Sequence, residues 1–334
     1  MKKFVKPLIL LAALLAVWQI VRLTTRRPDR PNAELALSVT FDPAAVSRIE
    51  ISRGAEIVTL LGGEGGWKVK TSQAIKPADS AAVNGALSSL GAINSTDIVS
   101  HNPAKQEEFS VQEGGGTRVR LYGRNDESLE DLIIGKLGGF ESQQMAIQRG
   151  QINENQFFTY MRRGDGDRVY KVQGFFGGSL GTDSEQWRDH DLLKFNLDNC
   201  SRISLTYPGE KVVAERDTSG SWRLIEPQTD FPVDTVAIER IASTLSTLRA
   251  GGFVDSVVPA EILGLDKPAL VVGVRLTDNS EQQVSVGAKI GEGDLYYSLK
   301  QGDPQVYTLP EYRATQFMKH AADLIKAPLP GTEK

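Results

Sequence analysis

An internal repeat constrains the fold of this chain more than any other feature. Residues 46–51 match residues 200–205, residues 67–69 match residues 222–224, and Pro77-Ala78-Asp79 matches Pro232-Val233-Asp234, all at an offset of about 155 residues. Later matches are Val119 with Val274, Gly135 with Gly287, and Tyr170 with Tyr307. The offset becomes shorter because the first copy carries extra residues, which we place at 137–167. The chain is therefore predicted to contain a duplicated domain.

Both copies predict the same order of elements. A hairpin and a short strand beginning at Trp67 or Trp222 come first, followed by a helix whose amino terminus is capped by Asp79 or Asp234. A second antiparallel group follows, with strands predicted in the first copy at 118–122, 129–134, 144–149 and 168–172. Further helices are expected at 174–180 and 312–325. The predicted class is α+β, with two tandem repeats of an antiparallel-strand unit with one main helix each, at 36–192 and 193–327, and a disordered tail at 328–334.

The amino terminus predicts a membrane anchor in front of the repeats. Basic residues precede an apolar run, and residues 4–23 approach the roughly 20 residues needed to cross a bilayer. A cleaved secretory signal is the alternative, although no small-x-small cleavage site follows the run. We assign residues 1–35 to a cytoplasmic tip, a transmembrane anchor and a linker. The expected location is the bacterial inner (cytoplasmic) membrane, single-pass, with the bulk of the chain in the periplasm.

Charge argues against a nucleic-acid partner. Seven Lys/Arg and one Asp lie in residues 1–30, which leaves 31 basic and 41 acidic residues and a net charge of about −10 in the remainder. The single cysteine, Cys200, cannot form an intramolecular disulfide and aligns with Val46, so it is expected to be a small buried residue.

No arrangement of residues predicts catalysis. His101, His190 and His320 are far apart in sequence and lack partners at metal-ligand spacing, and there is no nucleophile elbow or phosphate-binding glycine loop. We therefore expect no metal, no cofactor and no enzymatic activity.

Two segments are candidates for function. The insertion at 137–167 breaks the symmetry of the repeat, and its aromatic residues are candidates for contact with a protein partner: Phe140, Phe157, Phe158 and Tyr160. The second segment lies where the copies join, as Trp187, Arg188, Asp189 and His190. It can be a structural junction, in which Arg188→Ala would remove a buried ion and cost about 3–5 kcal/mol, or a ligand site.

The order of these motifs resembles a bacterial envelope family known as domain-of-unknown-function family number 4340. The resemblance rests on the Trp strands, the Pro-x-Asp helix starts, the Phe109-Ser110-Val111 and Leu263-Gly264-Leu265 links, and Trp187-Arg188-Asp189. It implies a periplasmic region held by an anchor and an accessory role beside an ABC-type transporter. We expect a non-catalytic interaction module; the alternative is an envelope hydrolase or ligand-binding protein with an unrecognised site between the repeats.

Overall fold

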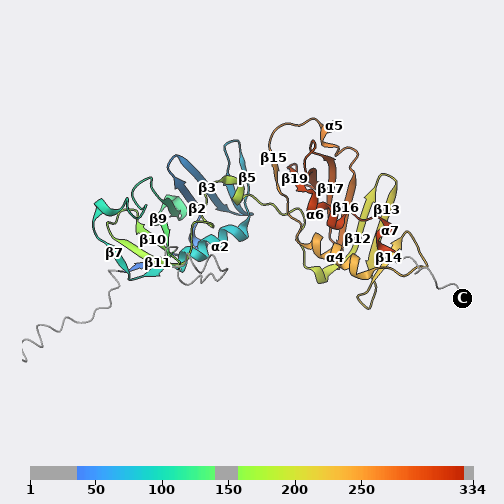
Figure 1. Cartoon of the computed structure of the whole chain (residues 1–334), viewed down its shortest axis with the longest axis horizontal. Helices are drawn as coiled ribbons and strands as arrows, with labels where there is room; N and C mark the ends of the chain where they lie inside the picture. The colour runs from blue at the N-terminus through green and yellow to red at the C-terminus, as the bar shows by residue number, and fades with distance from the viewer. Residues whose placement is uncertain (1–35, 140–156, 327–334) are drawn as a thin grey trace, which may run out of the picture. The chain divides into compact units, whose positions relative to one another are not determined.

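The computed structural model describes residues 36–139 and 157–326 of the 334-residue chain. Contacts divide the chain into two compact units, with the boundary between Arg188 and Asp189 (Figure 1). The predicted anchor at residues 4–23 lies outside the described residues, as do Phe140 and the expected tail at 328–334. Within the two described ranges, no helix is long and apolar enough to cross a membrane.

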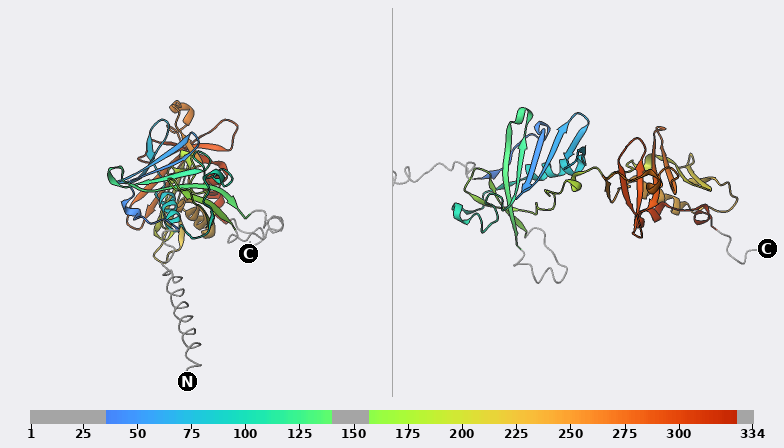
Figure 2. Two further views of the ribbon diagram at one scale, coloured as in Figure 1. Left: turned by 90° about the vertical axis from the view of Figure 1, so that its left-hand side faces the viewer. Right: turned by 90° about the horizontal axis from the view of Figure 1, so that it is seen from above.

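The first unit is built on a nine-stranded antiparallel sheet with the order β5-β4-β3-β2-β8-β9-β10-β11-β7. Its strands are β2 (Arg48–Arg53), β3 (Glu56–Gly63), β4 (Gly66–Lys70), β5 (Ile75–Pro77), β7 (Ile98–Ser100), β8 (Thr117–Tyr122), β9 (Ser128–Gly138), β10 (Phe158–Arg163) and β11 (Val169–Gln173). A small second sheet pairs β1 (Leu37–Ser38) with β6 (Asn94–Ser95). The main helix is α2 (Ser80–Gly91), which lies beside one face of the large sheet (Figure 2).

The second unit has an eight-stranded antiparallel sheet with the order β14-β13-β12-β16-β17-β18-β19-β15. Its strands are β12 (Cys200–Tyr207), β13 (Glu210–Arg216), β14 (Trp222–Glu226), β15 (Gly252–Val254), β16 (Leu270–Leu276), β17 (Glu281–Lys289), β18 (Leu295–Lys300) and β19 (Val306–Pro310). Its helices are α4 (Thr235–Ser246), α5 (Ala260–Leu263), α6 (Glu311–Phe317) and α7 (Ala321–Leu324). Short 3-10 turns in the two units are η1 (Pro43–Ala45), η2 (Pro103–Lys105), η3 (Arg124–Asp126), η5 (Ser184–Trp187) and η6 (Leu197–Asn199).

The two strand orders are the same once β5 is set aside, which supports the predicted duplication. Trp67 pairs with Gly62 of β3, and Trp222 pairs with Arg216 of the equivalent β13. The two tryptophans therefore occupy the same place in their sheets. The architecture is α+β, with mostly antiparallel strands and few helices, which agrees with the predicted class.

One predicted alignment is wrong by two residues. We aligned Val119 with Val274, but Val119 pairs with Ile51, and the residue that pairs with the equivalent Leu205 is Val272. An irregularity in β12 between Cys200 and Arg202 shifts the register there. A shift of two residues keeps every side chain on its original face, so the apolar pattern could not reveal it.

Both main helices begin as predicted. The Asp79 carboxylate accepts hydrogen bonds from the amides of Ala81 and Ala82, and the Asp234 carboxylate accepts from those of Val236 and Ala237. Such caps satisfy amides that have no partner inside the helix.

Each unit has its own core, formed between the main helix and one face of the sheet. In the first unit Ile49 and Ile51 of β2 pack with Leu87 of α2, and in the second unit Ile203 of β12 packs with Ile241 of α4. Alternate residues of each strand point to the opposite face. We call that opposite face, away from α2 or α4, the outer face.

In both units a loop crosses the outer face at a glycine. A Cβ atom at Gly135 would overlap the carbonyl oxygen of Phe109, and one at Gly287 would overlap that of Leu263. The residues after these carbonyls, which both have a positive φ, are Ser110 and Gly264. The two links that carried the family resemblance therefore cross the sheet at equivalent glycines in the two copies.

Three further predictions need correction or fall outside the described residues. The helix expected at 174–180 is absent, because this segment forms turns with Gly174 at φ +113°. The helix expected at 312–325 is two short helices, α6 and α7. The strand expected at 144–149 lies outside the described residues, and its place in the sheet is taken by β10, which we had included in the insertion.

Candidate protein-interaction site

The predicted contact residues that the structure describes lie at the start of β10, directly after residues 140–156 in the chain. Phe158 and Tyr160 point to the outer face, since Phe158 pairs with Gly138 and Gln173, and Tyr160 pairs with Lys171. Phe157 immediately precedes the strand. These three aromatic residues are half-buried rather than fully packed in a core.

The rings form a connected row on the outer face. Phe158 meets Tyr160 edge-to-face with the ring centroids 5.3 Å apart, and Tyr160 lies 4.7 Å from Phe109. The Lys171 ammonium sits 4.3 Å from the centroid of the Phe158 ring, within the range of a cation–π interaction. Tyr160 also packs against a small cluster that includes Val111, so it is partly a structural residue. Phe158 is the member of the row that comes first in the chain after residues 140–156.

Hydrogen bonds from backbone and side-chain groups hold the start of β10 against Gln173 and Gly174. The Phe157 carbonyl accepts from the Gly174 amide at 3.0 Å and from the Gln173 side-chain amide at 2.7 Å. The Thr159 hydroxyl donates to the Gly174 carbonyl at 2.8 Å. The aromatic residues therefore sit on a fixed part of the sheet.

Sequence reasoning missed one member of this group, Phe175. It directly follows Gly174 and is 63% exposed, a high value for a large apolar side chain. It was overlooked because residues 174–180 were interpreted as a helix. We call Phe157, Phe158, Tyr160 and Phe175 the aromatic end.

The second unit has only part of the aromatic end, because aromatic residues stand at two of the four positions: Tyr297 for Tyr160, and Tyr312, which is 64% exposed, for Phe175. The register places Leu295 where the first unit has Phe158, and Tyr297 where it has Tyr160. The link between β17 and β18 spans only residues 290–294, whereas the link between β9 and β10 spans residues 139–157. The long link and the phenylalanines thus belong to the first copy alone.

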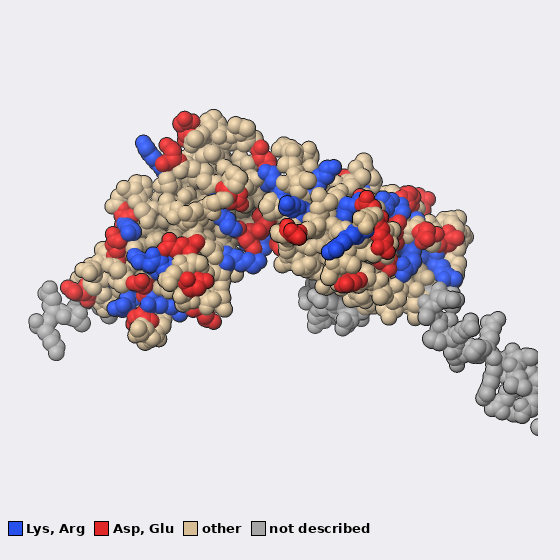
Figure 3. Space-filling view, turned by 180° about the vertical axis from the view of Figure 1, so that it is seen from behind, with Lys and Arg blue, Asp and Glu red and all other residues tan. Residues whose placement is uncertain are grey.

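The outer face of the first sheet carries alternating charges toward the end of β9 that lies away from Phe158. Arg118 makes a bidentate contact with Asp131 at 2.8 and 2.6 Å, and Arg120 lies between Asp131 and Glu50 at 3.8 and 3.7 Å. The hydrogen bonds to Asp131 raise the pKa of the Arg118 guanidinium above its ordinary value. Basic and acidic side chains are interspersed over the visible surface of each unit, without a large patch of one sign (Figure 3).

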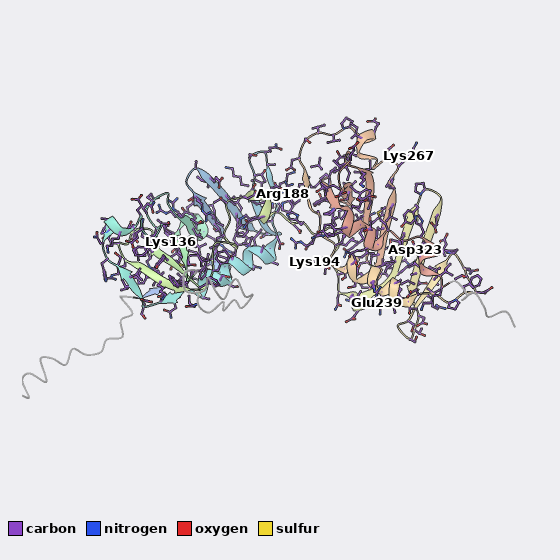
Figure 4. The ribbon with its side chains drawn as sticks, viewed as in Figure 1. Lys136, Arg188, Lys194, Glu239, Lys267 and Asp323 are labelled. Atoms are coloured by element: carbon purple, nitrogen blue, oxygen red, sulfur yellow. The ribbon has the colours of Figure 1, made fainter. Side chains whose placement is uncertain are left out.

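The four predicted junction residues divide between the two units. Trp187 is buried in the core of the first unit and donates from its indole nitrogen to the Gly181 carbonyl at 3.0 Å. Arg188 ends that unit (Figure 4), is 1% exposed, and pairs with Glu185 at 2.9 Å. Because the Glu185 side chain is 46% exposed, only the arginine half of this pair is buried.

Asp189 and His190 contact residues of the second unit. The Asp189 carboxylate accepts from the Asp191 amide, and the His190 ring packs against Phe253 with centroids 4.6 Å apart. The His190 backbone carbonyl accepts from the Ala250 amide at 2.8 Å. No group of three or more His, Cys, Asp or Glu residues suited to a metal ion occurs in residues 36–139 and 157–326.

Comparison with known proteins gives one result. A family model described as Domain of unknown function (DUF4340) matches the chain twice, over residues 67–255 and 222–329. No curated protein and no solved structure gives a significant match. The two matches begin at the equivalent Trp67 and Trp222, overlap over residues 222–255 and together cover most of the chain, so the chain belongs to the DUF4340 family of domains of unknown function.

Proposed function

We propose that this chain is a non-catalytic interaction module that is anchored in the bacterial inner membrane through residues 4–23 and holds both units in the periplasm. Its partner is an envelope protein, and its role is accessory to an ABC-type transporter or envelope assembly. The location rests on the basic and apolar amino terminus, and the transporter on the family resemblance.

The aromatic end is the observation that carries the proposal. Duplication gave both units the same sheet, but only the first has the long link and the phenylalanines beside it. Aromatic side chains that are held rigidly and left partly exposed are typical anchors of protein interfaces. Phe175 supplies exposed area, while Phe158 and Tyr160 supply a fixed aromatic row.

A loop exchange between the copies tests this proposal. Residues 139–157 are replaced by the second copy's own link, residues 290–294, which already joins two strands of the same kind. We expect the thermal transition to change little, because the grafted link already joins the equivalent pair of strands in the second unit. Recovery of partners by affinity purification from membranes should be lost.

Point variants separate the aromatic surface from the link. Phe158→Leu introduces the residue of the second copy, and Phe175→Ser removes the most exposed ring of the aromatic end. Each should lower partner recovery, since loss of an interface anchor typically costs about 2 kcal/mol or more. Phe231→Ser is the matched control, because Phe231 is 54% exposed but belongs to the second unit. Undiminished recovery from the loop exchange and from both point variants would contradict the proposal.

A further inference from the structure

A polar pocket of about 220 Å³ lies on the outer face of the second sheet. Its floor is Gly273 of β16, flanked by Ser204 of β12 and Gln283 of β17, which pair with Gly273 from either side. Gln301 also lines it, and its backbone amide donates to the Gln283 carbonyl at 2.9 Å. The pocket is therefore built from regular strands rather than from flexible loops.

The pocket lies where the second copy has uncharged residues at three positions that are charged in the first copy. The cross-strand register makes three positions of the two sheets equivalent. They are Glu50, Arg120 and Asp131 in the first sheet, and Ser204, Gly273 and Gln283 in the second. In the first sheet the arginine lies across the row between the two carboxylates. In the second sheet a glycine takes its place and leaves the space open.

The adjacent row places two arginines side by side. Arg202 and Arg275 are direct cross-strand partners on the outer face. Like charges that face each other across a sheet are destabilising. At the equivalent positions of the first sheet, Arg48 instead stacks over the uncharged ring of Tyr122, with its guanidinium carbon 3.7 Å from the ring centroid. The second copy thus has uncharged residues in place of Glu50, Arg120 and Asp131, and an arginine in place of Tyr122.

Of the carboxylates that pair with the cationic residues, only Glu281 belongs to the lining. Arg275 is held by Glu281 at 2.6 Å, whereas Arg202 is 4.0 Å from its nearest acid, Glu215. Lys211, the third cationic residue of the lining, pairs with Glu226 at 3.2 Å. Glu215 and Glu226 are not part of the lining, so the lining itself contains three cationic side chains and one carboxylate.

The remaining polar groups are available to a ligand. Among the described residues, no side-chain hydrogen bond involves the amides of Gln283 or Gln301, and the Ser204 hydroxyl makes one long bond of 3.4 Å to the Gly273 carbonyl. A phosphate or carboxylate group can accept from guanidinium, amide and hydroxyl donors at once. A volume of about 220 Å³ is below the usual range for ligand pockets, roughly 300–1,000 Å³, so the compound must be small.

We propose that this pocket binds a small oxyanion-bearing compound, with Arg202 and Arg275 contacting a phosphate or carboxylate group. Gln283, Gln301 and Ser204 hydrogen-bond to its remaining polar atoms. This site is independent of the aromatic end and adds a ligand to the proposed interaction module.

The test uses the full chain in detergent and follows alkylation of Cys200, a fully buried thiol at the start of β12. A ligand that binds the folded unit slows alkylation, because it makes the opened state rarer. Inorganic phosphate and succinate are titrated separately at constant ionic strength, to distinguish phosphate from carboxylate recognition. We expect a saturable slowing by at least one of them. Arg275→Gln should weaken the apparent affinity by about tenfold or more, as for loss of one charge-assisted contact.

Two variants test the proposal by introducing into the pocket the residues that the first copy has at the same positions. Ser204→Glu and Gln283→Asp each place a carboxylate in the pocket, and the second is one methylene shorter than the glutamine and adds no bulk, so at least one should remain folded by circular dichroism. Both folded variants should lose the saturable response. Ser88→Glu in α2 adds the same charge to the first unit, and this variant should keep the saturable response. The proposal is overturned if neither anion slows alkylation of the parent, or if the carboxylate variants respond as the parent does, because that outcome would show only the general stabilisation that such salts cause.

Discussion

Substitution of Gly287 by alanine should destabilise the second unit in a way that its single cysteine can report. A Cβ atom at this position would lie closer than 3.0 Å to the Leu263 carbonyl oxygen, and Leu265 would be in tight contact with it. The obstructing atom belongs to the backbone of the crossing loop, so rotation of a side chain cannot relieve the overlap. Forcing an extra carbon into such a site typically costs about 1–3 kcal/mol.

Alkylation of Cys200 measures this cost under native conditions. The thiol is buried in the core of the second unit, and burial raises its pKa to about 11, so it reacts only when the unit opens. Because 1.4 kcal/mol corresponds to a factor of ten, Gly287→Ala should accelerate alkylation by about 5- to 150-fold. Mass spectrometry after timed quenching gives the rate.

Gly209→Ala is the matched control, because a Cβ atom there meets nothing within 4 Å. Its effect should stay within about 0.5 kcal/mol, as for surface substitutions away from special features. An alkylation rate in Gly287→Ala equal to that of the parent and of Gly209→Ala would refute the claim that a loop crosses β17 at this glycine.

Three further predictions concern stability. Arg188→Ala should cost about 1–3 kcal/mol in urea unfolding, less than a fully buried ion pair, because Glu185 can be hydrated once its partner is gone; a loss above that range would show that the guanidinium has stronger partners. Asp234→Ala should cost about 0.5–2 kcal/mol through loss of the α4 cap, and an unchanged urea midpoint would contradict the capping role. The hydrogen bond from the Ala321 amide is the main cause of the lowered pKa of Glu210, so the stabilisation it gives is complete above the ordinary pKa of a glutamate and is lost as the pH falls through the lowered value. Glu210→Gln should therefore unfold with a weaker acid dependence than the parent, and identical dependence in thermal scans from neutral to acidic pH would count against this contact.

Local signals with a specific physical role were readable from the sequence. Asp79 and Asp234 each precede an apolar helical stripe and do cap those helices. Trp67 and Trp222 share a position in the sheet, and the similarity of their surroundings made the duplication visible. Cys200 is fully buried, as its alignment with an apolar residue predicted.

The failures arose where the pattern itself is ambiguous. Val119 was aligned two residues away from its true equivalent because a slip of two preserves inward and outward faces. In β10 both faces carry large side chains, Phe158 and Tyr160 outward and Met161 inward, so the strand lacked the apolar–polar alternation that identifies a half-buried strand. The pocket over Gly273 required the register of both sheets, which the sequence could not supply.

Site-specific photo-crosslinking in intact cells tests the central claim most directly, namely that the aromatic end of the first unit contacts an envelope protein. A photoreactive phenylalanine analogue is placed at Phe158, at Phe175, and at Leu295, which is the equivalent of Phe158 in the second unit. The account predicts a crosslinked envelope protein from the two positions of the aromatic end and none from Leu295. Equal crosslinking at all three positions, or none at Phe158 and Phe175, would contradict it.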